Sequence, residues 1–163
     1  MTTAAKTIEI KVHSSANAVG KMRNEIEVFA LFGKDVRYNL STDEGEFHGG
    51  DSTAPPPLFY FCAGLTGCFM TQVRAFAKKM RIPLDGLKVD GLFQWRAHLN
   101  ESEPYVGAPV GFDFDIAIDS PAPAEDIAKL VNAAKQGCFI EQTMRTVNAI
   151  GHRVTLRGEV LDL

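Results

Sequence analysis

Residues 58–70 read LFYFCAGLTGCFM, a dense apolar stretch with a cysteine, Cys68, near its end. The stretch continues into QVRAFAKKM at residues 72–80, where apolar residues recur at helical spacing. Together these segments predict one long helix over about 58–80, which Pro83 ends. The uninterrupted apolar part is shorter than the roughly 20 residues that a membrane span needs. It therefore predicts a helix that protein covers on all sides.

The segments around this helix predict an α+β protein with mostly antiparallel strand pairing. Strands come first and helices follow, which favours that class over alternating strand and helix units. We expect one domain, 1–163, with N-terminal strands over 1–57, the central helix over 58–82 and a strand and helix part over 83–163. The expected strands are 7–12, 24–31, 36–40, 87–99, 110–118 and 153–161. The other expected elements are a loop over 41–57, a helix that begins at Ser120-Pro121 and a short helix over 138–148.

Composition excludes several classes of function. The 163 residues are 45% apolar and 23% charged, with a net charge of -3. An ordinary composition and a slightly negative charge favour neither nucleic acid nor an anionic membrane as partner. The N-terminus lacks the apolar core of a signal peptide. Three cysteines in a chain of this kind suggest a reducing compartment, so we expect a cytoplasmic protein.

The cysteines and histidines suggest redox chemistry and no metal site. Cys68 lies at the junction of the apolar stretch and a cationic helix end, and Cys138 lies near the end of a second helical pattern. The two thiols can form a redox pair, although a free cysteine is often only a small buried hydrophobic residue. Cys62 lies about 120° from Cys68 around the helix and is more readily a core residue. Because the four histidines are scattered singly, we expect no zinc or iron site and no cofactor.

Several segments resemble the OsmC/Ohr family of osmotically inducible and organic-hydroperoxide-resistance proteins. The similarity is carried by GDSTAPPPLF at 50–59, AGLTGCFMT at 63–71, RAFAKK at 74–79, IPLDGLKV at 82–89 and LVNAAKQGC at 130–138. The resemblance implies an intertwined homodimer with a long buried central helix. It also implies that a peroxidatic cysteine reduces organic hydroperoxides and that a resolving cysteine then forms a disulfide with it. Cys68 matches the first position and Cys138 the second.

Two positions depart from the family's pattern. Leu58 stands where family peroxidases usually carry a glutamate, and Phe139-Ile140 follows the second cysteine in place of proline. The family's activating arginine comes from the N-terminal strands, where Arg23 is our candidate and Arg37 the second choice. A guanidinium suits the role because it stays charged and can hydrogen-bond a peroxide.

The predicted activity is therefore thiol-dependent reduction of apolar hydroperoxides, with Cys68, Cys138 and Arg23 in the site. An external dithiol, such as a lipoylated protein, would then reduce the disulfide. Two alternatives stay open. One is an OsmC-fold protein without efficient peroxidase activity, which binds an apolar ligand or acts as a thiol redox sensor. The other is a structural dimer whose cysteines serve packing. Aromatic residues on the helix, Phe59, Tyr60, Phe61 and Phe69, either line a pocket or belong to the core.

Overall fold

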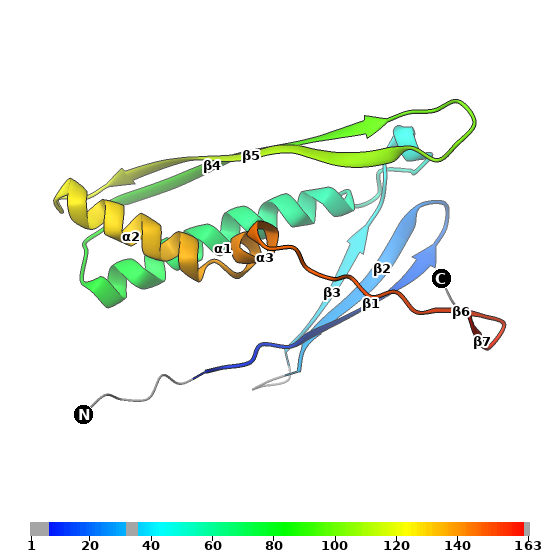
Figure 1. The fold of residues 1–163 in the computed structure, drawn as a ribbon, viewed down its shortest axis with the longest axis horizontal. Helices are drawn as coiled ribbons and strands as arrows, with labels where there is room; N and C mark the ends of the chain where they lie inside the picture. Colours follow the sequence, from blue (N-terminus) through cyan, green and yellow to red (C-terminus); the bar gives the residue numbers. More distant parts are fainter. Residues whose placement is uncertain (1–6, 32–35, 162–163) are drawn as a thin grey trace. The chain divides into compact units, whose positions relative to one another are not determined.

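The computed structural model describes residues 7–31 and 36–161, and these form two compact units. The first unit spans Met1–Ala63 and the second Gly64–Leu163. The long helix α1, Pro57–Met80, begins in the first unit and continues in the second. Each unit is described separately below, and Figure 1 labels their elements.

The first unit is built around an antiparallel sheet of three strands in the order β1-β2-β3. These are β1 (Val12–Val19), β2 (Arg23–Ala30) and β3 (Arg37–Thr42). A tight turn joins β1 to β2, and Gly20 adopts the left-handed conformation there that glycine tolerates best. After β3 the chain folds into a loop with one short 3-10 helix, η1 (Glu46–His48), before α1 begins.

The first strand corrects the prediction of a strand over 7–12. The strand begins only at Val12 and continues through the small, polar residues that predicted a turn. Every residue of β1 is exposed, and within the described residues β1 is an edge strand that pairs with β2. Pairing with the more apolar β2 therefore overrides the low strand propensity of Ser14 to Asn17.

The second unit is a long antiparallel hairpin with helices packed on one face (Figure 1). The hairpin strands are β4 (Gly86–His98) and β5 (Val106–Asp119), and the helices are α1, α2 (Ala124–Gly137) and α3 (Phe139–Arg145). Along β5, Phe112, Phe114, Ile116 and Ile118 are half-buried, and the residues between them are exposed. This period of two turns one face of the hairpin toward the helices, as the alternation in the sequence predicts.

The fully buried core of the second unit comes from α1, β4, α2 and the junction after α2, while β5 and α3 contribute partly buried residues. Its buried members are Leu65, Phe69, Val73, Ala77, Val89, Leu130, Ala134 and Cys138. On α1 the buried residues recur every fourth position, so one stripe of the helix faces the core. The other sides of α1 are not covered within one chain, because Phe59 at its start is 64% exposed. Within a single copy, protein therefore covers one side of α1, and coverage of its other sides by a second copy stays a prediction.

The C-terminal segment also differs from the prediction of one strand over 153–161. It forms a small hairpin of β6 (Val154–Leu156) and β7 (Glu159–Leu161). The residues between them, Arg157 and Gly158, both have positive φ, as in the tight two-residue turns that join the strands of a β-hairpin. The glycine was the only sequence feature that marked this turn.

Every strand pair of the described residues is antiparallel, which confirms the α+β assignment. The predicted positions of the central helix, both long strands and the two later helices are confirmed to within a few residues. Within the described ranges, no helix combines the length and the apolar character that crossing a membrane requires.

Candidate functional site: a pair of thiols beside an apolar pocket

Cys68 lies in the middle of α1, on the flank of the buried stripe. Its side chain is half-buried and packs against the core of the second unit. The next residue, Phe69, points into that core and stacks on Phe114 of β5 at 5.3 Å between ring centroids. Phe69 is only 1% exposed and belongs to the core.

Cys138 lies at the junction of α2 and α3. Its backbone N–H donates to the carbonyl of Ala134 at 2.9 Å and so closes α2. Its sulfur accepts a hydrogen bond from the backbone N–H of Glu141 at 3.5 Å, so the same residue caps the start of α3. The side chain is fully buried, with 0% exposure. The helix break at Gly137 therefore places a thiol inside the core.

The structure brings Cys68 and Cys138 together as two free thiols. Burial is the main reason that the pKa of Cys138 rises to about 11, and hydrogen bonding to the sulfur of Cys68 raises it further. The hydrogen bond from Glu141 opposes this rise. At neutral pH Cys138 is therefore a protonated thiol, and Cys68 is near enough to affect its pKa.

A close approach of α1 and α2 makes this pairing possible. A Cβ atom on Gly137 would come within 2.6 Å of the ring of Phe76 and within 3.4 Å of the side-chain oxygen of Gln72. Only glycine lets α2 end this close to α1 without displacing that ring. On the other side of Cys68, a Cβ on Gly64 would touch Ile140 of α3 at 3.5 Å. Gly64 thus packs against another helix.

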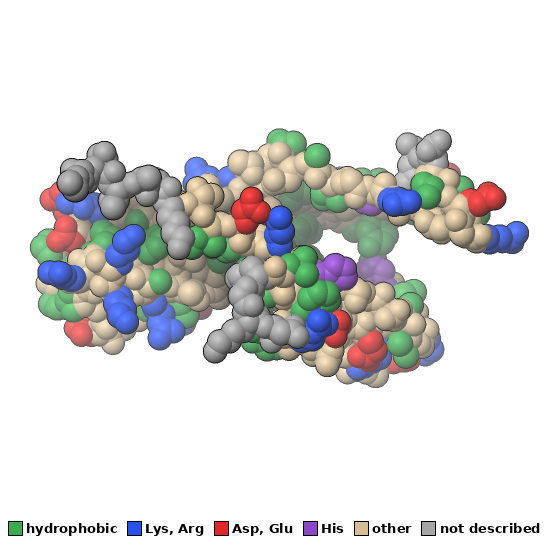
Figure 2. All heavy atoms as spheres, turned by 90° about the horizontal axis from the view of Figure 1, so that it is seen from below, with side chains coloured by type: hydrophobic (Ala, Val, Ile, Leu, Met, Phe, Trp, Pro, Cys, Tyr) green, Lys and Arg blue, Asp and Glu red, His purple; other side chains and the backbone are tan. Residues whose placement is uncertain are grey.

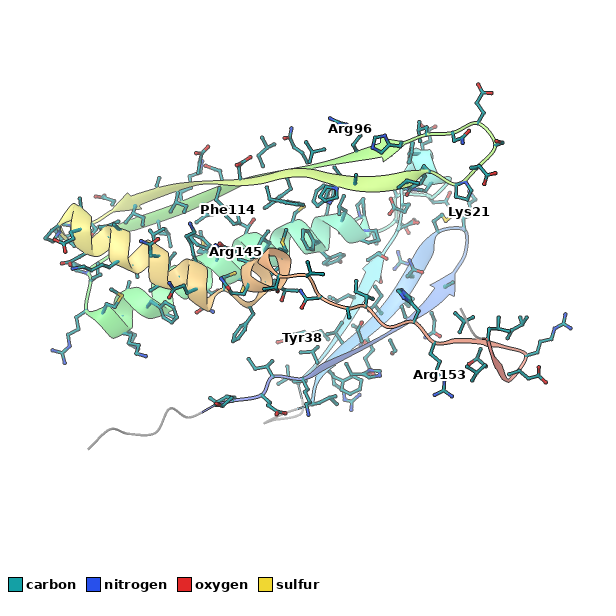
Figure 3. The ribbon with its side chains drawn as sticks, viewed as in Figure 1. Lys21, Tyr38, Arg96, Phe114, Arg145 and Arg153 are labelled. Carbon is teal, nitrogen blue, oxygen red and sulfur yellow. The ribbon has the colours of Figure 1, made fainter. Side chains whose placement is uncertain are left out.

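The second unit also has a mostly apolar pocket of about 300 Å³, which is lined in part by neighbours of the two cysteines in the sequence and not by the cysteines themselves. Its lining residues come from α1, β5 and α3, and they are Leu65, Phe112, Phe114, Glu141, Met144 and Arg145. Leu65 lies one helical turn before Cys68, and Glu141 is the residue whose N–H contacts Cys138. Figure 3 shows Phe114 on the hairpin and Arg145 on α3, the two sides of this pocket.

Sequence reasoning missed this pocket. The sequence predicted a strand over 110–118, but it did not show that α3 would leave space beside Phe112 and Phe114 of that strand. Arg145 and Glu141 add polar groups at the pocket, with their charged atoms 3.7 Å apart. The arrangement suits a mostly apolar molecule that carries a polar group at one end.

Arg23, the predicted activating residue, belongs to the first unit and is not among the residues that pack around the thiols in the second. It stands at the start of β2, where its side chain hydrogen-bonds Glu25 and Thr53. Arg37 pairs with Glu27 at 3.2 Å and lies over the ring of Phe29 at 4.4 Å. These contacts give Arg37 a role within the sheet of the first unit.

The third cysteine and the histidines add no further reactive centre to the site. Cys62 is half-buried near the start of α1, and burial raises its pKa, which agrees with a packing residue. Among the described residues, no cluster of three or more His, Cys, Asp or Glu side chains could hold a metal ion. His48 hydrogen-bonds Glu44 at 3.2 Å within the loop that follows β3.

Comparisons with known proteins agree with this architecture. The family model described as "OsmC-like protein" matches residues 49–152, which include both cysteines of the pair. The structure is similar to that of an OsmC-like hydroperoxide resistance protein from Jannaschia sp. CCS1. The two share 41% sequence identity over 93% of this chain and 96% of that one, with a TM-score of 0.64.

More distant structures share the fold. An organic hydroperoxide resistance protein OsmC from Legionella pneumophila is 18% identical, with coverage of 86% of this chain and 92% of that one and a TM-score of 0.60. An organic hydroperoxide resistance protein from Elizabethkingia anophelis is 17% identical, with coverage of 86% and 91% and a TM-score of 0.54. A search of curated proteins finds no match to the chain.

Proposed function

Because the chain belongs to the OsmC-like family, we propose that it is a thiol-dependent peroxidase that reduces organic hydroperoxides. The observation that carries this proposal is the proximity of Cys68 and Cys138, two free thiols from distant parts of the sequence, which is close enough for Cys68 to raise the pKa of Cys138. Cysteines that serve packing alone need not lie near one another, whereas a two-cysteine peroxidase requires its two thiols to be close.

In the first step, the thiolate of Cys68 attacks the terminal oxygen of R–O–OH. The O–O bond breaks, an S–O bond forms, and the alkoxide takes a proton to leave as the alcohol ROH. Cys68 becomes a sulfenic acid, and the peroxide is reduced by two electrons. Arg23 is the proposed cation that stabilises the thiolate and binds the peroxide oxygen.

In the second step, Cys138 attacks the sulfur of the sulfenic acid. An S–S bond forms, and the hydroxyl group leaves as water with the proton of the Cys138 thiol. With its pKa at about 11, Cys138 retains that proton at neutral pH until the attack. An external dithiol then reduces the disulfide and is itself oxidised, which returns both thiols to the starting state.

The substrate preference follows from the pocket beside the thiols. Four of its six lining residues, Leu65, Phe112, Phe114 and Met144, are apolar, and its volume is about 300 Å³. Such a site favours a hydroperoxide with an alkyl or aryl body over hydrogen peroxide, which cannot use apolar contacts.

A homodimer in the cytoplasm completes the proposal. The first turns of α1 expose three consecutive aromatic side chains, Phe59, Tyr60 and Phe61. Exposed apolar side chains also appear between charged ones on the face that Figure 2 shows. A contiguous apolar patch usually marks an interaction surface, and a second copy of the chain offers the same patch in return.

Peroxide consumption tests this function. We expect turnover of cumene hydroperoxide with dithiothreitol or dihydrolipoamide, and slower turnover of hydrogen peroxide. Cys68→Ser removes turnover, Cys138→Ser blocks the intramolecular disulfide, and Cys62→Ser serves as the matched control that retains both. Consumption in the Cys68→Ser variant equal to that of the wild type would disprove the mechanism.

A further inference from the structure

A buried carboxylate organises the loop that follows β3. Asp43 is only 1% exposed, and its two oxygens accept hydrogen bonds from three groups of its own loop. One oxygen accepts from the backbone N–H of Glu44 at 2.9 Å. The other accepts from the backbone N–H of Thr53 at 2.9 Å and from its hydroxyl at 2.7 Å. These hydrogen bonds lower the pKa of Asp43, so the group is a carboxylate at neutral pH.

The same loop holds Thr53 in one conformation. A Cβ on Gly50 would overlap the carbonyl of Glu44, so the two sides of the loop approach more closely than any other residue allows. The backbone N–H of Ser52 donates to that carbonyl at 3.1 Å. Thr53 therefore follows a closed turn, and both its N–H and its hydroxyl donate hydrogen bonds to Asp43.

The hydroxyl of Thr53 then fixes the direction of the next hydrogen bond. A hydroxyl has one hydrogen, and Thr53 donates it to Asp43, so its oxygen can only accept from other groups. Nη1 of Arg23 donates to this oxygen at 2.8 Å and to the backbone carbonyl of Thr53 at 3.2 Å. Two consecutive hydrogen bonds through the Thr53 hydroxyl thus link the Arg23 guanidinium to the Asp43 carboxylate.

A second carboxylate holds the other end of the guanidinium. Nε of Arg23 donates to Glu25 at 2.7 Å, and the hydroxyl of Ser41 donates to the other oxygen of Glu25 at 2.8 Å. The side chain of Arg23 is 31% exposed, so it is neither a free surface arginine nor a buried one. Within the described part of the chain, Nη2 of Arg23 has no hydrogen-bond partner.

We propose that Asp43 and Thr53 are positioning residues, which orient Arg23 so that Nη2 is presented to the hydroperoxide. This inference rests on the proposed function, in which Arg23 is the cation of the peroxidase site. An unrestrained arginine has many side-chain rotamers, and part of this conformational entropy is lost when it binds a substrate. Here the fold has already ordered the guanidinium at two of its three nitrogens. In this chain Glu25 accepts a hydrogen bond from the arginine directly, and Asp43 is linked to it through Thr53. Leu58 has no carboxylate.

Three variants test the proposal through kcat/KM for cumene hydroperoxide. We expect Arg23→Met to lower it about 100-fold and Thr53→Val about 10-fold, the range expected for losing hydrogen bonds to a charged group. Thr53→Ser retains the hydroxyl and is the matched control, with activity within about twofold of the wild type. The rate of alkylation of Cys68 at neutral pH, measured in a Cys62→Ser, Cys138→Ser background, should fall in the same order.

A double variant separates positioning from a merely structural role. If Thr53 acts through Arg23, then adding Thr53→Val to Arg23→Met changes kcat/KM by less than about twofold, because the two effects share one pathway. Equal losses from Thr53→Val in both backgrounds would overturn the positioning role. Thr53→Ala replaces Thr53→Val if the latter does not fold.

The outcomes also separate this inference from the proposed function. Wild-type activity in Thr53→Val alongside a large loss in Arg23→Met rejects the positioning role and leaves the peroxidase standing. Wild-type activity in Arg23→Met rejects both the role of Arg23 and its positioning, whereas turnover that depends on Cys68 would still support the peroxidase.

Discussion

Cys138 and Arg23, the two residues proposed to support Cys68, are held in place by opposite kinds of force. Cys138 is fixed by apolar packing, and burial raises the pKa of its thiol to about 11. Arg23 is fixed by hydrogen bonds to Glu25 and Thr53, and the carboxylate of Asp43 behind Thr53 has its pKa lowered. Packing therefore favours the neutral form of a group, and the hydrogen-bonded loop favours the charged form. The proposed chemistry uses both: the proton of the Cys138 thiol leaves with the water of the second step, and Arg23 supplies a permanent cation.

Breaking the packing around Cys138 should have the largest effect. Leu130 of α2 is fully buried, at 0% exposure, in the core that also contains Cys138. We expect Leu130→Ala to lower the free energy of unfolding by about 2–5 kcal/mol, the usual cost of such a truncation. Urea denaturation of the reduced protein measures this loss.

The matched control for this change is Leu156→Ala, because Leu156 is 57% exposed in β6. A surface truncation of this kind should change stability by about 0.5 kcal/mol or less. Equal losses in the two variants would show that the described core does not hold the second unit together.

Alkaline pH should weaken the second unit through Cys138 itself. In the unfolded chain a cysteine ionises near its ordinary value of 9.0, whereas in the fold it stays protonated up to about 11. Between these values the unfolded state binds fewer protons, so stability falls as pH rises and is fully retained below the lower value. Two pKa units correspond to a loss of about 3 kcal/mol.

The loss should disappear when the thiol is removed. Unfolding of the reduced protein at about pH 8 and about pH 11, compared with the same pair of measurements on Cys138→Ala, isolates this contribution from other titrating groups. An identical fall in stability in both proteins would mean that the environment of Cys138 does not hold its proton.

The sequence predicted the second unit better than the first, because packing leaves a periodic pattern in a sequence and single hydrogen bonds do not. In the second unit, apolar periodicity predicted the long helix, both long strands and the second-cysteine helix, because packing leaves a period of 2 or 3.6 in the sequence. The pairing of Cys68 with Cys138 came from the family resemblance, since nothing in the spacing of two residues seventy positions apart brings them together.

The first unit was predicted less well. The edge strand β1 was misplaced because its residues are small and polar, and its strand conformation comes from pairing with β2. The network from Asp43 to Arg23 left no periodic trace either, because hydrogen bonds join single residues across loops. Arg23 was selected by resemblance, while Thr53 and Asp43 emerged only from the geometry.

The smallest predicted effect separates the two steps of the reaction. Gly137→Ala adds a methyl group that would meet the ring of Phe76 at 2.6 Å, so either that ring or the end of α2 must shift. We expect formation of the Cys68–Cys138 disulfide to slow about tenfold, because a small displacement of reacting groups is costly. Dimedone trapping of the sulfenic acid and the mass loss on disulfide formation measure the two steps separately.

The first step should be unaffected, because Cys68 lies on α1 and not on the displaced helix. Gly67→Ala is the matched control, since it makes the same substitution inside a helix where no atom lies within 4 Å of the added methyl group. If Gly137→Ala slowed sulfenic acid formation as much as disulfide formation, the displaced helix would have to act on Cys68 itself. In that case packing would control the reactivity of the first thiol as well as the reach of the second, and the division of labour between the two units would not hold.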